Sequence, residues 1–361
     1  MFTQLSLVST DVGFSHVKTH ANGQDILFPS VVAIGRERIL AHTFFEDHGE
    51  ITVDQVVDKL HINYRGRDYF VGKLGAKNGG EYNWAVNRLD TLETKISALT
   101  SIALTMVASK QNNQNFMVVT GLPIEHFRDS HLRREYEKSL TGKHEITFIL
   151  PNGKTLTKSF LIVKLRVLPQ GLGCFYDVTF GEEGHVARPE LLRNKHLLVD
   201  IGFRTVDVTV VNDFEPVDLS SYSLDGKGIK RALENILEDI KGTKDGAGRL
   251  AYSEFNKTLS EMEEIFLAGS FFYDGQNVDL SPYVERWMPE LVSEIENSVD
   301  TRLGGFSSFH HVFLSGGGGI ATHKFFRNPR VELTPGSWFA NCHGFYKVAF
   351  RQLREKLARI D

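Results

Sequence analysis

The chain has 361 residues, a formal net charge of −4, 41% hydrophobic residues and 24% charged residues. Its length exceeds that of one ordinary hydrophobic core and suits two domains. The acidic balance argues against a protein that coats nucleic acid electrostatically. Two distant cysteines, Cys174 and Cys342, indicate neither a disulfide framework nor a zinc ribbon. No apolar run approaches the ~18 residues of a membrane span, and no secretory signal is evident, so we expect a cytoplasmic protein.

The first predicted element is a β-hairpin at residues 5–20, with its turn at Gly13. Asp11 precedes the turn, and Ser15 and Lys18 follow it. A glycine lets an anion approach the turn, whose N–H groups can bind it. A carboxylate acts on phosphate only through Mg²⁺ or an ordered water. Lys18 is either a solvated strand lysine or a cation that contacts phosphate.

The elements that follow are mostly short. We expect strands within 25–35 and 61–72, a helix over 92–110, a buried strand over 115–123 and a charged surface helix over 124–140. Residues 144–168 alternate like a hairpin with its turn at 151–153. Gln170 then follows Pro169 at the start of a possible helix. Such a glutamine is either a cap or surface residue, or a side chain that orients a water attacking phosphate.

A second hairpin spans residues 197–211 and carries Asp200 and Gly202 in the same order as the first. A single D-x-G turn is common in hairpins. Two such turns about half a chain apart suggest two related α/β domains facing each other across a cleft. Gly226 and Gly228 come next, just before an amphipathic helix at 229–240.

The last third predicts a loop at 241–252, helices at 253–269 and 282–303, and a final helix from about Gly344. Between these helices, a buried strand leads through Ser315 into four glycines at 316–319. Bare backbone of this kind lets a base or a phosphate approach closely. Two alternatives are a structural loop and a dinucleotide fold, because Gly316, Gly318 and Ala321 satisfy G-x-G-x-x-A. P-loop, H-E-x-x-H, G-x-S-x-G and kinase signatures are absent from the sequence.

Five stretches follow one another along the chain in this order: DVGFSHVK, VVTGLP, DIGFRTVD, SGGGGI and FANCHGFYKVA. This order resembles the actin–Hsp70–sugar kinase superfamily over nearly the whole chain. Within it, the sequence is most similar to the ParM-type actins of plasmid partition and their archaeal relatives. The resemblance implies an α/β actin-like fold with two RNase H-like domains flanking a nucleotide cleft. Domain I would comprise 1–180, completed by a helix at 341–361, and domain II would comprise 181–340.

The resemblance also implies roles for particular residues. Asp11 and Asp200 would hold Mg²⁺ through water, and Gln170 would polarise the attacking water, so these three are the implied catalytic residues. The second hairpin departs from the family at Phe203 and Arg204, where many relatives have small or polar residues. The implied nucleotide-binding residues are Gly13, Phe14, Ser15, Lys18, Gly202, Phe203, Arg204, Thr205, Gly228, Gly316, Gly317 and Gly318.

The implied function is a slow ATPase that polymerises into homopolymeric filaments for plasmid DNA segregation. Its cofactors would be ATP or ADP, with GTP as the alternative nucleotide, and Mg²⁺. Its partners would be further copies of itself and a DNA-binding adaptor protein, without direct binding to nucleic acid. The alternatives are an actin-like scaffold for cell shape, division or pilus assembly, and a small-molecule kinase of the same fold.

Overall fold

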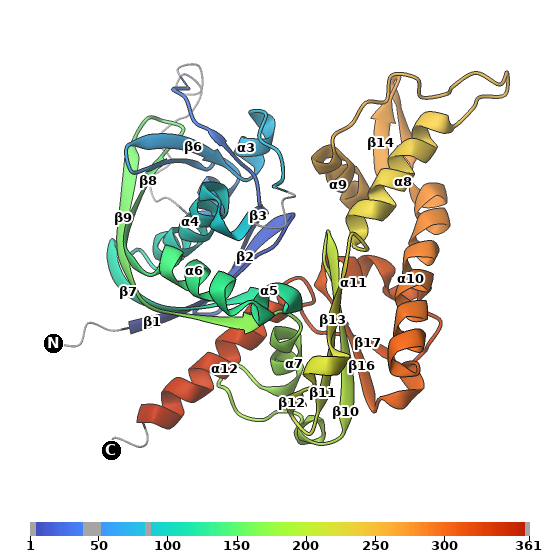
Figure 1. Ribbon diagram of the computed structural model, residues 1–361. Coiled ribbons are helices and arrows are strands. Elements are labelled where there is room, and N and C mark those ends of the chain that lie inside the picture. Colours follow the sequence, from blue (N-terminus) through green and yellow to red (C-terminus); the bar gives the residue numbers. More distant parts are fainter. Residues whose placement is uncertain (1–4, 39–51, 84–87, 358–361) are drawn as a thin grey trace. The chain divides into compact units, whose positions relative to one another are not determined.

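The computed structural model describes residues 5–38, 52–83 and 88–357 (Figure 1). The chain forms two compact units. Unit 1 comprises Met1–Pro189 and Phe339–Asp361, and unit 2 comprises Glu190–Trp338. The divisions fall after residues 189 and 338, whereas the sequence-based expectation put them after 180 and 340. No helix among the described residues combines the length and hydropathy that a membrane span requires.

Within the described residues, unit 1 contains a nine-stranded mixed sheet in the order β3-β2-β1-β7-β9-β8-β5-β6-β4. Strand β1 pairs antiparallel with β2 and parallel with β7. The strands are β1 (Leu5–Val12), β2 (His16–Ala21), β3 (Gln24–Pro29), β4 (Val32–Ile34), β5 (His61–Tyr64), β6 (Arg67–Val71), β7 (Asn113–Leu122), β8 (Gly142–Ile149) and β9 (Thr155–Pro169).

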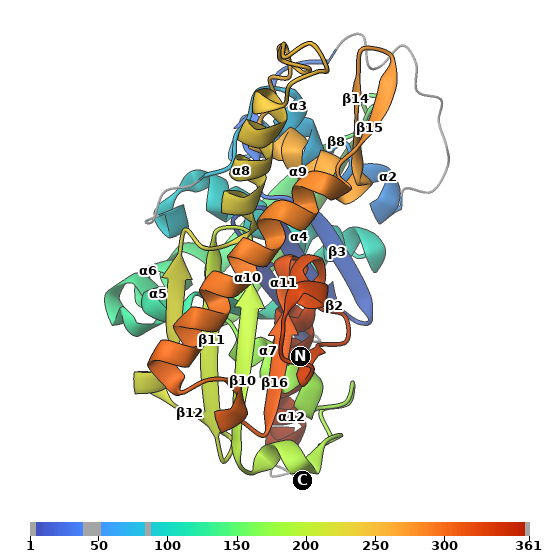
Figure 2. The ribbon, with the colours of Figure 1, turned by 90° about the vertical axis from the view of Figure 1, so that its right-hand side faces the viewer.

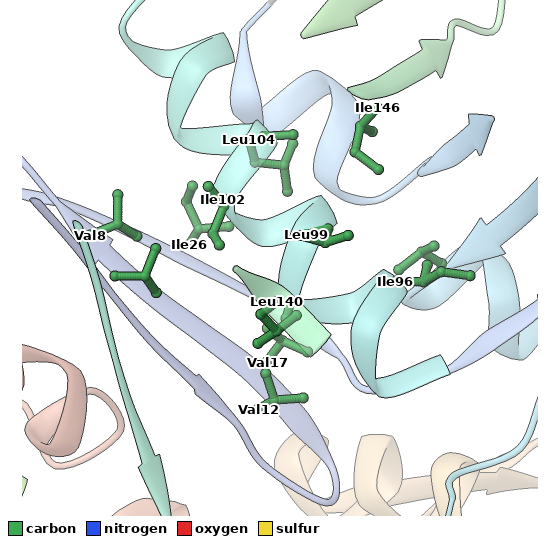
Figure 3. Close-up of a cluster of buried hydrophobic side chains, with 14 of the residues drawn as sticks. Val8, Val12, Val17, Ile26, Ile96, Leu99, Ile102, Leu104, Leu140 and Ile146 are labelled. Atoms are coloured by element: carbon green, nitrogen blue, oxygen red, sulfur yellow. The ribbon is translucent and has the colours of Figure 1, made fainter. Parts of the chain in front are cut away.

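The sheet of unit 1 curls around the helix α4 (Leu92–Ala108) (Figure 1). Thr91 caps this helix by accepting a hydrogen bond from the Thr94 N–H, and no glycine or proline interrupts it. Ile96, Leu99 and Ile102 are fully buried against the sheet (Figure 3). The other helices of unit 1 are α2 (Val53–Val57), α3 (Lys73–Lys77), the 3₁₀ turn η1 (Arg88–Asp90), α5 (Ile124–Arg128), α6 (Ser130–Leu140), α7 (Leu172–Thr179) and α12 (Ala340–Leu357).

Unit 2 is built on a six-stranded sheet with the central order β12-β11-β10-β16-β17, and β13 also pairs with β11. The helix α10 (Ser281–Leu303) lies across one face of this sheet (Figure 2). The elements of unit 2 are β10 (Lys195–Ile201), β11 (Thr205–Asn212), β12 (Glu215–Pro216), η3 (Asp218–Ser220), β13 (Tyr222–Asp225), α8 (Ile229–Gly242), α9 (Leu259–Ala268), β14 (Ser270–Tyr273), β15 (Gln276–Asp279), α10 (Ser281–Leu303), η4 (Phe306–Ser308), β16 (His311–Ser315), α11 (Gly316–Thr322), η5 (His323–Phe325) and β17 (Val331–Leu333). The turn η2 (Pro189–Leu192) leads into unit 2.

Several predicted boundaries were wrong, and side-chain capping explains two of them. Residues 124–140 form two helices rather than one, because the Asp129 carboxylate accepts hydrogen bonds from the His131 and Leu132 N–H groups and starts α6. The helix predicted at 253–269 begins only at Leu259, after a capping box between Thr258 and Glu261. The last helix starts at residue 340 rather than 344, and the four glycines lie inside α11 rather than before it.

Candidate functional site

The first hairpin, β1–β2, makes a tight turn at Gly13. The Gly13 N–H donates to the His16 carbonyl oxygen at 3.0 Å. A Cβ added at Gly13 would lie 2.8 Å from that oxygen, which is closer than real Cβ contacts. The turn therefore requires glycine at this position.

Three residues predicted for catalysis and phosphate binding meet beside this turn. Asp11 lies at the end of β1 with a residue exposure of 3%. Its Oδ1 accepts a hydrogen bond from Gln170 Nε2 at 2.7 Å, and Lys18 Nζ lies 3.7 Å from its Oδ2. The strand register explains the second contact, because Asp11 and Lys18 are directly opposed in the β1–β2 ladder.

Sequence reasoning missed Arg88, a buried cation beside this turn. Arg88 is buried, donates a hydrogen bond to the Val12 carbonyl oxygen, and places its guanidinium 4.2 Å from the Phe14 ring centroid. Phe14, predicted to bind nucleotide, therefore packs its ring against a buried arginine. No motif contains Arg88, and it lies 76 residues beyond Val12 in the chain, so the sequence carried no signal for this contact.

The pKa of His16 shows that positive charges act on this turn. Burial, followed by the charges of Lys18 and Lys73, lowers the pKa of His16 to about 3. The imidazole is therefore neutral at physiological pH, with Nδ1 3.1 Å from the Ser15 hydroxyl oxygen. Lysine charges that act on this half-buried ring would also favour a bound anion.

Asn341 of α12 fixes the start of α7, just after Gln170. Its Oδ1 accepts hydrogen bonds from the Gly171 N–H at 3.1 Å and from the Cys174 thiol at 3.3 Å. The Gln170 N–H donates to the Leu122 carbonyl oxygen at 2.7 Å. The backbone that carries Gln170 is thus held by two other elements of unit 1. The N-x-x-G-F-Y stretch signalled Asn341 but not this contact.

The second hairpin, β10–β11, repeats the geometry of the first in unit 2. The Gly202 N–H donates to the Thr205 carbonyl oxygen at 2.9 Å, as Gly13 does to His16. Asp200 is 8% exposed, and its Oδ1 accepts a hydrogen bond from the Ser315 hydroxyl at 3.1 Å. Each hairpin thus places a buried aspartate beside a glycine turn, with a hydrogen-bond donor from a neighbouring segment.

Phe203 and Arg204, the two departures from the family pattern, are engaged within unit 2. Arg204 forms a two-point ion pair with Asp225, with Nε–Oδ1 and Nη2–Oδ2 distances of 2.7 and 2.9 Å. Phe203 is buried, and its carbonyl oxygen accepts from the Lys230 N–H at 2.8 Å. A Cβ at Gly228 would collide with that same carbonyl. Packing of the hairpin on the start of α8 therefore accounts for Gly228 without a ligand.

The glycines of α11 also have packing partners within unit 2. A Cβ at Gly316 would lie 2.6 Å from Asp200 Oδ1, and one at Gly318 would lie 2.8 Å from Ile229 Cγ1. At Gly317 the nearest neighbour would be the Trp338 ring at 3.0 Å. Gly316 and Gly318 thus allow α11 to approach the second hairpin. Gly317 is the half-buried member of the three.

Each hairpin, taken by itself, has donors that suit a phosphate accompanied by Mg²⁺. Carboxylate oxygens suit Mg²⁺, which keeps several of its waters and takes one or two carboxylates. Asp11 provides such oxygens beside the glycine turn of unit 1, and Asp200 provides them beside the glycine turn of unit 2. A lysine beside Asp11 supplies positive charge for the phosphate.

Two families of known proteins match the chain, one within each unit. Residues 9–173 match the family described as "Actin like proteins N terminal domain", and residues 198–328 match "Archaeal actin homologue MreB-like, C-terminal". The chain is an actin-like protein. No curated protein matches the chain at a significant level.

Solved actin-like structures share its fold at low sequence identity. The actin-like protein Alp7A has a TM-score of 0.77 and 13% identity, with 98% of each chain covered. A ParM from a 15-stranded filament of Clostridium botulinum has a TM-score of 0.74 and 21% identity, covering 97% of this chain and 99% of that one. A Bacillus thuringiensis ParM solved with ATP has a TM-score of 0.72 and 16% identity, covering 98% of this chain and 99% of that one.

Proposed function

We propose that this actin-like protein binds Mg²⁺-ATP through residues of both hairpins, hydrolyses it slowly and polymerises into filaments that segregate DNA. The observation that carries the proposal is the repeated hairpin geometry around Asp11 and Asp200. One glycine turn beside a buried aspartate is a common structural feature. Two copies with matching backbone hydrogen bonds of 3.0 and 2.9 Å, in an actin-like fold, favour nucleotide binding.

Positioning and charge neutralisation would carry the catalysis, without a covalent intermediate. When bound, Mg²⁺ would neutralise charge on the phosphates, held through water by the two aspartates. Lys18 would add a positive charge beside the phosphates. Gln170 would hold the attacking water, since its amide already lies 2.7 Å from Asp11 Oδ1 and its backbone is fixed from both sides.

Filament formation is proposed by analogy with the structural neighbours. The Clostridium botulinum ParM was solved as a 15-stranded filament, and another neighbour is a ParM described as a non-polymerisable quadruple mutant. A head-to-tail contact that does not close on itself generates a filament of this kind. The net charge of −4 favours contact with DNA through an adaptor protein rather than directly.

Equilibrium binding of ATP tests the nucleotide part of the proposal. Isothermal titration calorimetry of the intact chain with Mg²⁺-ATP should show one site. Lys18→Ala should weaken binding about tenfold or more, because it removes a partly buried cation beside the phosphates. Lys164→Ala, at an exposed lysine of β9, is the matched control and should bind as the unmodified protein does. Absence of ATP binding by the unmodified chain would refute the proposed function.

A further inference from the structure

Three potential metal ligands meet in unit 1 where α12 lies against the β2–β3 ladder. They are His20 of β2, Asp25 of β3 and His343 of α12, and their ligand atoms all lie within 4.8 Å of one another. His20 and Asp25 are directly opposed in the strand register. Among the described residues, this is the one such group of three His, Cys, Asp or Glu side chains.

The Asp25 carboxylate lies between the two imidazoles. Its Oδ1 is 2.7 Å from His20 Nδ1 and 2.9 Å from His343 Nε2, and Oδ2 is 3.1 Å from the same His343 nitrogen. The rings of His20 and His343 stand edge-to-face, with centroids 4.7 Å apart. Both ring nitrogens therefore point at the same Asp25 oxygen from different directions. The ligand atoms of a metal site converge on one point in a similar way.

A rearrangement of side chains would convert this hydrogen-bonded group into a coordination site. In a tetrahedral zinc site with bonds of about 2.0 Å, neighbouring ligand atoms lie about 3.3 Å apart. The two N···O distances of 2.7 and 2.9 Å would thus grow by about half an ångström, and the two ring nitrogens, which lie within 4.8 Å of each other, would approach by up to about 1.5 Å. Asp25 can make this adjustment, because its side chain is 38% exposed, whereas His20 is 6% exposed and fixed. Solvent beside Asp25 could supply a fourth ligand.

Neighbouring rings hold the two imidazoles in place. The Tyr346 ring stands edge-on to His20, with centroids 4.9 Å apart, and Phe339 stacks on His343 at 5.8 Å. Two imidazoles and one carboxylate, supported in this way, form a donor set that suits zinc and related transition metals rather than Mg²⁺ or Ca²⁺.

We propose that His20, Asp25 and His343 bind a divalent transition metal of the zinc class, which clamps α12 to the β2–β3 hairpin. This site is separate from the aspartates assigned to Mg²⁺, and it does not depend on the proposed function. Binding requires the two ring nitrogens that face the carboxylate to be unprotonated, so a neutral imidazole would carry its proton on its other ring nitrogen and an imidazolium would release one proton to solvent. The clamp would also act next to the candidate nucleotide site, because Cys342 Sγ donates to the Lys18 carbonyl oxygen at 3.3 Å.

Direct metal binding to the untagged chain, without nucleotide, tests the proposal. Equilibrium dialysis against Zn²⁺ should give one equivalent per chain, and Co²⁺ should produce visible absorption bands typical of a low-symmetry nitrogen and oxygen site. Zinc at about 100 times its dissociation constant should raise the melting temperature by about 3–6 °C. The unmodified protein provides all three readouts.

Two variants and one control decide the assignment. Asp25→Asn should weaken zinc binding at least about 100-fold, since even supporting contacts of a metal site contribute 10–100-fold. His343→Gln is a second variant with the same expected result. His131→Gln, at a 74% exposed histidine of α6, should leave binding unchanged. If the unmodified chain takes up no zinc, or Asp25→Asn and His343→Gln both bind as tightly as it does, the site is not a metal site.

Discussion

Gln170 has a specific proposed role, which is to hold the water that attacks the phosphate. Its amide donates to Asp11, and the Gly171 N–H beside it is held by Asn341. Gln170→Ala should lower the rate of ATP hydrolysis by roughly 10²–10³-fold, the loss typical of one preorganised polar group. Phosphate release under saturating ATP measures this. Gln276→Ala, at an exposed position of β15, is the control and should hydrolyse ATP at the unmodified rate. Equal rates for all three proteins would remove Gln170 from the mechanism.

His16 predicts how stability depends on pH. Its pKa in the folded protein is about 3, below the ordinary value of 6.5, so below pH 6.5 the unfolded chain binds one more proton at this position. The free energy of unfolding should therefore fall as pH falls, by up to about 1.4 kcal/mol per pH unit from this residue alone.

Urea denaturation of the unmodified protein and His16→Gln between pH 7.5 and pH 5 isolates that contribution, because the other titrating groups are common to both. The unmodified protein should lose more stability than the variant over this range. Parallel pH profiles for the two proteins would contradict the neutral, buried state assigned to His16.

The residues of the candidate site could be predicted from the sequence where they lie in motifs, and could not be predicted where they lie outside them. Asp11, Lys18 and Gln170 were all selected from the sequence, and the structure brings them together. Arg88 was missed because its contact depends on the tertiary fold rather than on any local pattern. Arg204 was assigned to nucleotide, and its ion pair with Asp225 could not be anticipated because β13 was not predicted.

Among the elements, the crossing of α7 and α12 depends on two glycines. A Cβ at Gly344 would overlap the Gly173 carbonyl oxygen and lie 2.7 Å from the Asp177 N. Gly344→Ala should therefore reduce the free energy of unfolding by about 3 kcal/mol through overpacking. Gly242→Ala is the matched control, because nothing lies within 4 Å of a Cβ at that exposed end of α8. It should be neutral or stabilise by up to about 1 kcal/mol. Equal stability of the two variants would contradict the close crossing.

The same helix pair contains a buried ion pair that provides a further prediction. Lys347 Nζ of α12 lies 2.7 Å from Asp177 Oδ1 of α7, with side-chain exposures of 9% and 4%. Lys347→Met should destabilise the protein by about 3–5 kcal/mol, because it leaves a carboxylate buried without its cation. Thermal unfolding measures the loss, with Lys164→Met as the exposed control. A loss no larger than that of the control would show that the pair contributes little.

Elements with uninterrupted periodicity were predicted well, and elements whose ends depend on capping were not. The helix expected at 92–110 is α4, whose sequence has no glycine or proline to interrupt it. Asp129, by contrast, divides a segment that looked continuous, because its exposed carboxylate accepts hydrogen bonds from the His131 and Leu132 N–H groups in the first turn of α6. The hairpin β14–β15 was missed because Asp274-Gly275 was not recognised as its turn.

For the whole molecule, the order of motifs predicted more than any single motif. No single motif was specific, but the order of the motifs along the chain indicated an actin-like fold. The family matches and the structural neighbours show that fold. The handedness and strand number of a filament were beyond reach of this kind of inference. They depend on complementary surfaces between copies, which no local pattern records.

The most direct test of the account is light scattering combined with pelleting of the purified protein, in Mg²⁺-ATP, in Mg²⁺-ADP and without nucleotide, with phosphate release followed in parallel. Scattering and pelleted protein should rise with ATP and decline as phosphate appears. Asp200→Asn should slow phosphate release and delay the decline. Phosphate release with no polymer under any of these conditions would contradict the account and favour a small-molecule kinase of the same fold.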